Sequence, residues 1–148
     1  MKRRTSILLF LTAVTLLLAA HIADATASEV PMENDLLTGT EWWVEDIGGG
    51  GVIDNSHTTV RFVEAGRVAG DTGCNRYMGS YEMDETALKF GPLAGTRRAC
   101  IPALMDQEAK FYAAMARVTT WEVAETGLLH LRDADGETVI RAARVSDS

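Results

Sequence analysis

The sequence predicts an α+β domain, in which a strongly curved antiparallel sheet or partly closed barrel of about seven or eight strands packs against one α-helix. Short runs of alternating apolar and polar residues, separated by glycine-rich or acidic turns, recur along most of the chain. Residues 102–118 depart from that period of two and place apolar residues three and four positions apart. Because strand signals precede and follow this segment, we expect the helix to close the open side or end of the sheet.

The N-terminal 27 residues have the pattern of a secretory signal peptide. Residues 2–4 are basic, residues 7–20 are almost all apolar, and residues 25–27 form the small-x-small pattern that signal peptidase accepts. The alternative is an uncleaved membrane anchor, but the apolar stretch is shorter than the roughly 20 residues that a span needs. We therefore predict cleavage after Ala27 and export of a soluble protein, periplasmic or secreted, without a membrane span in its mature form.

The predicted mature chain, residues 28–148, has 121 residues, enough for one domain with a hydrophobic core. Residues 28–36 lack aromatics and are rich in acidic residues, so we predict a disordered lead-in and place the domain at residues 37–148. The formal charge of −7 becomes −9 once three basic residues and one acidic residue leave with the signal peptide. Nucleic acid and anionic membranes are therefore not expected partners. The acidity favours solubility or, alternatively, attraction of a basic partner.

Strand signals follow one another along the domain, and each ends at a turn. The first, residues 42–47, ends at four consecutive glycines, which predict a flexible hairpin loop because no Gly-Lys-Ser or Gly-Lys-Thr follows them. In residues 58–63, Val60 and Phe62 fall on one face, and a turn at residues 64–66 predicts a hairpin with the next strand. That next strand is residues 67–69, and further strands are predicted at residues 77–83, 88–90, 119–123, 128–132 and 138–144.

The helix is predicted over residues 102–118, with Pro102 in the first turn, where a missing N–H is tolerated. One side of this helix is apolar and should pack on the sheet: Leu104, Met105, Phe111, Tyr112, Met115 and Val118. The opposite side is polar and should face solvent: Asp106, Gln107, Lys110 and Arg117.

The two cysteines, Cys74 and Cys100, are predicted to form a disulfide, because an oxidising compartment favours a bridge. Closing a loop of about 27 residues would stabilise the domain by roughly 3 to 4 kcal/mol in the chain-entropy model. Such a bridge would tie the start of the helix to the sheet. Free thiols and a redox or metal role stay open as alternatives, although no CxxC spacing is present.

The run Gly70-Asp71-Thr72-Gly73-Cys74-Asn75-Arg76 has two possible interpretations. In the structural one, Gly70 and Gly73 allow close backbone approach or a positive φ, and Asn75 bonds to neighbouring backbone. In the functional one, the run contributes to a recognition patch that holds a carboxylate or phosphate group. The residues of that candidate patch are Asn75, Arg76, Arg97 and Arg98.

No residue pattern indicates catalysis or metal binding, so we expect no enzymatic activity and no cofactor. His57 follows Asp54 and Ser56, but the GxSxG pattern of a nucleophile elbow is missing and a solvated loop is favoured. His130 lies between two leucines on a predicted strand and should face outward. The Asp133-x-Asp135 pair opens like a calcium loop, yet the remaining ligands are absent and a turn is favoured.

Five segments together resemble the META domain family, also called the heat-shock protein HslJ-like family. They are Leu37 to Trp42, Gly70 to Arg76 with Gly79 and Tyr81, Thr96 to Cys100, Glu108 to Phe111, and Leu129 to Leu131 before Asp135-Gly136. The resemblance implies structural roles for the motif residues Trp42, Gly70, Gly73, Gly79 and Thr96. It also implies a small exported β-rich domain with a helix, associated in bacteria with envelope and stress phenotypes and in some parasites with virulence.

The family brings no established enzymatic activity. Many bacterial members are lipoproteins, and this chain departs from them because no cysteine follows the apolar segment within range for lipidation. Membrane attachment is therefore not carried over.

Three functions are compatible with these observations. The first is a non-catalytic envelope or periplasmic factor that binds a protein partner or supports stress tolerance. A second is a cup for a small apolar or anionic ligand, lined by Trp42, Phe62 or Trp121. The third is a thiol-active redox protein with a reactive Cys74 or Cys100.

Overall fold

The structure is a computed structural model that describes residues 36–64 and 66–146. The predicted signal peptide and nearly all of the predicted lead-in, residues 28–36, lie outside the described residues. In the part of the chain that is described, no helix is long and apolar enough to cross a membrane.

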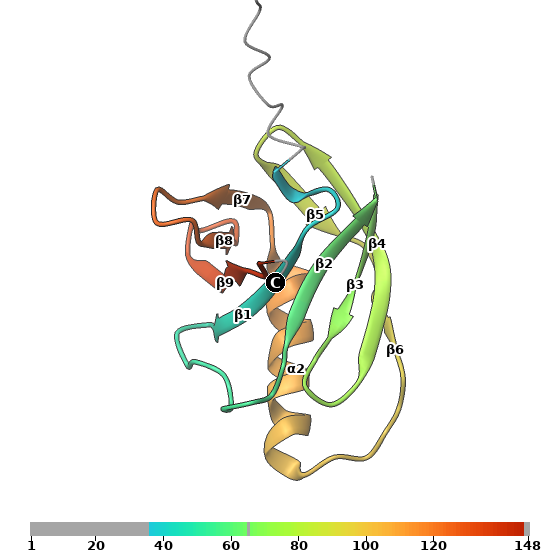
Figure 1. Cartoon of the computed structure of the whole chain (residues 1–148). Coiled ribbons are helices and arrows are strands. Elements are labelled where there is room, and N and C mark those ends of the chain that lie inside the picture. The colour runs from blue at the N-terminus through green and yellow to red at the C-terminus, as the bar shows by residue number, and fades with distance from the viewer. Residues whose placement is uncertain (1–35, 65, 147–148) are drawn as a thin grey trace, which may run out of the picture.

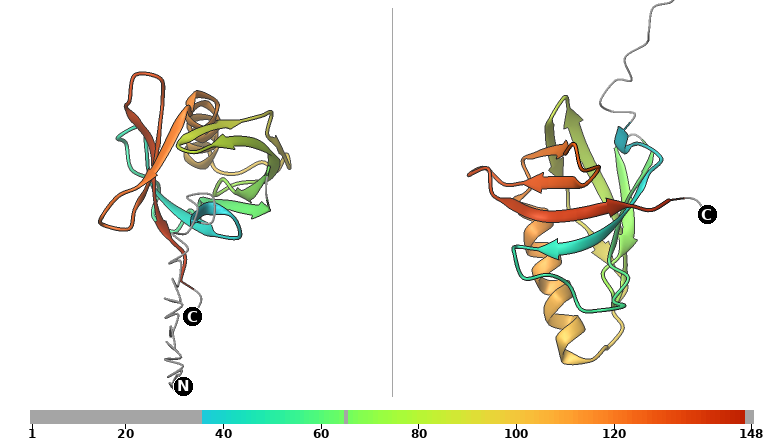
Figure 2. Two further views of the ribbon diagram at one scale, coloured as in Figure 1. Left: turned by 90° about the horizontal axis from the view of Figure 1, so that it is seen from above. Right: turned by 60° about the vertical axis from the view of Figure 1, so that its left-hand side comes forward.

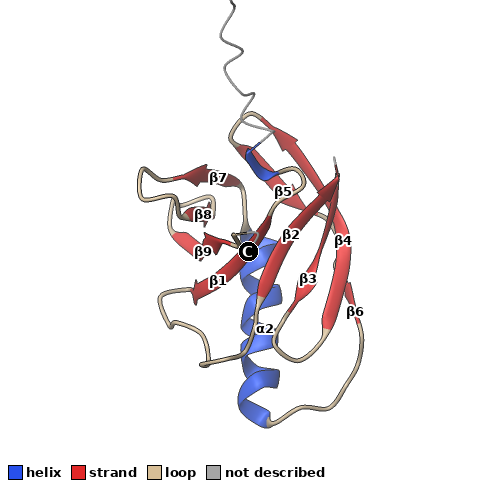
Figure 3. Cartoon of the chain, in the orientation of Figure 1, coloured by secondary structure: helices blue, strands red, loops and turns tan. Residues whose placement is uncertain are grey.

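The described residues form a mostly antiparallel sheet with a helix packed on it (Figure 1; Figure 3). The strands are β1 (Glu41–Ile47), β2 (Thr59–Glu64), β3 (Arg67–Asp71), β4 (Arg76–Asp84), β5 (Ala87–Phe90), β6 (Ala94–Gly95), β7 (Thr120–Val123), β8 (Leu129–Arg132) and β9 (Thr138–Arg144), and the helix is α2 (Pro102–Arg117). The predicted strands and helix are thus present. Sequence analysis missed β6, because two residues are too few to show a period.

The sheet closes on itself unevenly. Its strand order is β3-β2-β1-β9-β8-β7-β5-β4-β6, and an additional pairing of β3 with β4 joins its two sides. The β5–β7 junction is short, with the single register pair Ala87 and Thr120. Strand β6 continues the line of β5 along β4, since Tyr81 pairs with Phe90 and Tyr77 with Gly95. The predicted fold class is therefore confirmed as a partly closed sheet rather than an even barrel.

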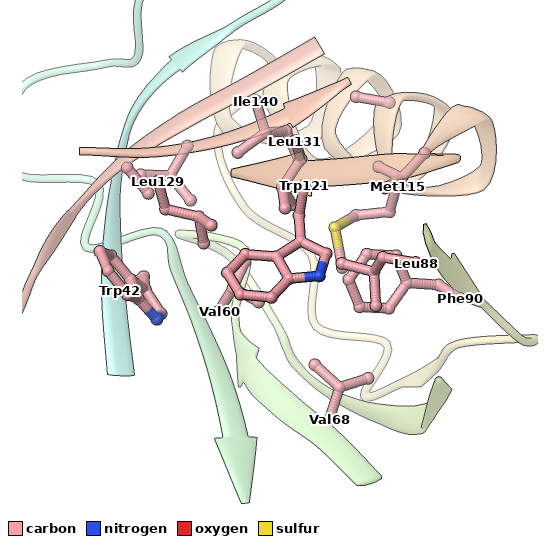
Figure 4. Close-up of a cluster of buried hydrophobic side chains, with 14 of the residues drawn as sticks. Trp42, Val60, Val68, Leu88, Phe90, Met115, Trp121, Leu129, Leu131 and Ile140 are labelled. Carbon is pink, nitrogen blue, oxygen red and sulfur yellow. The ribbon is translucent and has the colours of Figure 1, made fainter. Parts of the chain in front are cut away.

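Side chains fill the space that the sheet encloses (Figure 4). The predicted alternation in β2 holds, because Val60 and Phe62 are fully buried while Arg61 and Val63 are exposed. The largest fully buried side chains come from both halves of the sheet, from the helix and from the segment before β1: Trp42, Phe62, Phe111, Leu37, Leu88, Met115, Leu129, Leu131 and Ile140. Burial of this apolar area stabilises the fold by roughly 25 cal/mol per Å².

The ligand cup proposed for Trp42, Phe62 or Trp121 is not supported by this packing. All three side chains are almost completely buried, and each belongs to the hydrophobic core. Trp42 and Trp121 direct their rings into the same cluster of aliphatic side chains (Figure 4). These aromatic groups therefore hold the two halves of the sheet together instead of lining an open site.

Helix α2 lies in the gap between the β7–β9 half and the β4–β6 half of the sheet, and it contacts β9, β1 and β5 (Figure 2). Phe111 and Met115 are buried as expected. Two assignments of helix faces were wrong: Met105 is 49% exposed and Gln107 only 6% exposed. The first turns of α2 extend beyond the strands (Figure 1). Met105 belongs to these turns and is exposed, whereas the buried Gln107 amide has polar partners.

Candidate functional site

The glycine-rich motif forms the connection between β3 and β4, and a disulfide joins it to the start of α2. Cys74 in this turn is bonded to Cys100, which lies two residues before the helix, with a Cα–Cα distance of 5.9 Å. The structure thus has the helix-to-sheet link that the sequence suggested. Because the chain contains two cysteines and both are in this bridge, it has no free thiol for the thiol-active alternative.

Asn75 is an internal link of this turn. Its side chain is 3% exposed, and its Oδ1 accepts hydrogen bonds from the Arg98 backbone N–H at 2.7 Å and the Thr96 hydroxyl at 2.8 Å. Its Nδ2 donates to Oε1 of Glu108 at 3.2 Å. Since donor and acceptor groups of the amide are occupied by the protein, Asn75 holds the β3–β4 turn, the segment before α2 and the helix together.

Thr72 completes the same network and was not singled out from sequence. It is fully buried, its hydroxyl donates to Glu108, and the hydroxyl oxygen accepts the Asn75 backbone N–H at 2.9 Å. Asp71 accepts the backbone N–H of Gly73 at 2.7 Å. The same two carboxylates also affect Tyr112. Its pKa is raised mainly by burial and, to a smaller extent, by the nearby negative charges of Glu108 and Asp71. The acidic groups of the site therefore face hydrogen-bond donors of the protein itself.

The candidate recognition patch is divided by this arrangement. Asn75 points inward, whereas Arg76, Arg97 and Arg98 are exposed. Among the described residues, none of these three arginines forms an ion pair within 4.0 Å. The arginines remain candidates for contact with an acidic group, and Asn75 belongs to the framework that positions the chain on which they lie.

Two glycines of the motif are required by close contacts. A Cβ at Gly70 would lie 2.2 Å from the backbone oxygen of Thr59. Gly73 has φ of 88°, and a Cβ there would lie 2.8 Å from the backbone oxygen of Ser56. The turn that carries Cys74 is therefore packed directly against the loop between β1 and β2, a relationship that no local sequence pattern records.

Gln107 holds the same loop from the helix. Its Oε1 accepts the Ile53 backbone N–H at 2.7 Å, and its Nε2 donates to the Thr58 hydroxyl at 2.9 Å. Its spacing of four residues from the buried Phe111 is the one signal that could have placed it on the packed side. The loop of residues 52–58 is thus clamped between α2 and the Gly73 turn.

The fold and the bridge define a small antiparallel β domain with a covalently attached helix. The chain matches the META domain over residues 35–146, and it belongs to that family. No curated protein matches the chain.

Solved structures have the same fold. One is the NMR structure of a protein from Burkholderia xenovorans, with 26% identity and a TM-score of 0.62 over 76% of this chain and 86% of that one. Another NMR structure has 22% identity and a TM-score of 0.58 over 73% of this chain and 92% of that one, and this likeness concerns the fold alone.

Proposed function

We propose that this META domain is an exported, non-catalytic factor of the cell envelope that binds a protein partner or supports stress tolerance. The observation that carries the proposal is the Asn75 network: the polar groups that stand out in the sequence bond to one another and to the backbone. Groups held in this way stabilise a scaffold instead of activating a substrate. The signal-peptide pattern and the disulfide are both compatible with an oxidising compartment.

The exposed arginines give this scaffold a surface for a partner. Arg76 lies beside Thr96, the residue after β6, because the Thr96 backbone N–H donates to the Arg76 carbonyl at 2.9 Å, and Arg97 and Arg98 follow directly. Guanidinium groups without an ion-pair partner among the described residues can bind carboxylates of another protein in two-pronged geometry. We propose this basic surface, residues 76, 97 and 98, as the contact with an acidic segment of an envelope partner.

Fractionation of bacteria that express the full chain tests the export step. We expect a product that begins at Ser28 in the periplasmic fraction, with cysteines that react with an alkylating reagent only after reduction. A cytoplasmic, uncleaved product with two reactive thiols would contradict the proposal.

Site-specific photo-crosslinking in the same cells tests the surface. A crosslinker at position 97 should give a discrete adduct, and one at Arg61, an exposed arginine on β2, should not. Equal labelling from both positions, or none from either, would count against the basic surface.

A further inference from the structure

A groove lies on the outer side of the sheet, beside the loop that packs against the Gly73 turn. It has a volume of about 810 Å³, and its walls are the outer face of β1, the loop of residues 52–56 and the end of β9 with the residues that follow it. Trp43, Asp54, Asn55 and Arg144 are among the lining residues. The groove therefore combines an aromatic floor with a polar rim, which is the composition of a small-molecule site.

Trp43 presents its indole ring in this groove. It is 41% exposed, whereas its neighbour Trp42 is buried. Its cross-strand partners are Thr59 on β2 and Ala143 on β9, and both are too small to cover the ring. The His57 ring lies 4.9 Å from the indole at an angle of 44° and supports it from the loop.

Two polar side chains of the rim are not used by the fold. Asp54 and Asn55 are exposed, and neither side chain forms a hydrogen bond with another described residue. Arg144 pairs with Trp42 rather than with Trp43 in the sheet, and its guanidinium is used by the fold: it lies 5.7 Å from the centroid of the Trp42 ring and donates to the Leu36 carbonyl at 3.5 Å. In contrast to the Asn75 network, the donors and acceptors of Asp54 and Asn55 are free to bind a ligand.

The loop that carries the rim is preorganised. Asn55 and His57 have φ of 59° and 54°, a left-handed conformation that few residues other than glycine adopt. Gln107 fixes this loop through Ile53, and the Gly73 turn packs against Ser56. A rim held in one conformation before binding loses little conformational entropy when a ligand arrives.

We propose that this groove binds a neutral carbohydrate, so that the envelope factor has a glycan ligand. The C–H groups on one face of a pyranose ring carry partial positive charge and pack on the electron-rich face of an indole. Vicinal hydroxyls match the planar carboxylate of Asp54 and the planar amide of Asn55. The Asp54 carboxylate also disfavours an anionic ligand, so a neutral sugar fits this rim better than an acidic one. The inference rests on the proposed export, because glycans are abundant outside the cell membrane.

Calorimetric titration tests the inference, using protein recovered after expression of the full chain. The probes are the tetramer of N-acetylglucosamine, maltotetraose and purified peptidoglycan sacculi, the last in a sedimentation assay. We expect saturable binding of at least one probe, weakened at least tenfold in Trp43→Ala. Asn55→Gly keeps the left-handed backbone, removes the amide and should weaken binding as well. Met78→Ala, which truncates an exposed apolar side chain on β4, is the matched control and should bind like the unmodified protein.

Each outcome decides between the alternatives. Binding of the soluble oligosaccharides indicates a free sugar as the ligand, and binding of sacculi alone indicates the cell-wall polymer. The carbohydrate site is overturned if no probe binds up to about 10 mM, or if Trp43→Ala and Asn55→Gly both bind within about twofold of the unmodified protein. Neither result would alter cleavage or location of the protein in the fractionation experiment, so a failure of the glycan site is distinguishable from a failure of the export proposal.

Discussion

Gln107 in α2 accepts a 2.7 Å hydrogen bond from the backbone N–H of Ile53, in the loop between β1 and β2. The same amide donates to the buried hydroxyl of Thr58 at 2.9 Å. One helical side chain therefore satisfies an N–H and a hydroxyl of the same loop. Because the loop also forms a wall of the Trp43 groove, its position depends on the docking of the helix.

Replacing Gln107 by alanine should lower the free energy of unfolding by about 1 to 3 kcal/mol, because it leaves buried polar groups unpaired. Urea denaturation measures this loss, and hydrogen exchange should show faster exchange at the Ile53 amide. Asp106→Ala is the control, because Asp106 is exposed and forms a surface ion pair with Lys110, of the kind that contributes at most about 1 kcal/mol. Equal losses in both variants would show that the loop is held by other contacts.

The fold could be predicted because the residue pattern of each helix and strand lies within a short stretch of the chain. The alternation that buries Val60 and Phe62, and the helical spacing that buries Phe111 and Met115, follow from the burial of apolar side chains on one face. The polar exception is a helical residue. Gln107 has the spacing of a core residue but the chemistry of a surface residue, and only its partners in another loop decide its position.

The candidate site could be predicted only in part. Cys74 and Cys100 required no more than their number and compartment, whereas the role of Asn75 depends on Glu108, 33 residues further along the chain. The groove depends on Trp43 lying beside Ala143, and this pairing of distant strands leaves no local pattern. The sequence therefore predicted the disulfide but did not predict the Trp43 groove.

Gly73→Ala should destabilise the domain for two reasons. The positive φ of 88° is unfavourable for alanine, and the new Cβ would lie 2.8 Å from the backbone oxygen of Ser56. Strain of the first kind costs about 1 to 3 kcal/mol. The close contact should add to it and displace the loop. Urea denaturation measures the total.

Gly127→Ala is the matched control for this substitution. Gly127 has φ of 83°, and a Cβ there would meet no atom within 4 Å. The control therefore carries the conformational strain without the contact, and the difference between the two variants measures the packing of the motif against the loop. Indistinguishable losses of stability would mean that the loop yields and that the two segments are not tightly packed.

Replacing both Cys74 and Cys100 by serine should lower the free energy of unfolding by about 3 to 4 kcal/mol, because the unfolded chain regains the entropy of an open loop. The two residues are separated by 26 positions, and the bridge also holds Cys74 beside the start of α2. Reductant should destabilise the original protein and leave the double variant unchanged. A reductant effect on the double variant would mean that the loss has another cause.

Asp133 should make stability depend on pH in the acidic range. Partial burial on its own would raise its pKa, but backbone N–H donors from Glu137 and Asp135 and the guanidinium of Arg117 together lower the pKa below its ordinary value. A carboxyl with a lowered folded pKa stabilises the protein above its unfolded pKa of about 3.9, and this contribution is lost as the pH falls through the folded value. Asp133→Asn should therefore be less stable than the original protein at pH 6, and the difference should shrink below about pH 4.

Asp135→Asn removes the same charge from the same turn without breaking an ion pair among the described residues, so it should change stability little. A difference for Asp133→Asn that stays constant from pH 6 to about pH 2 would contradict the ionic role of this carboxylate.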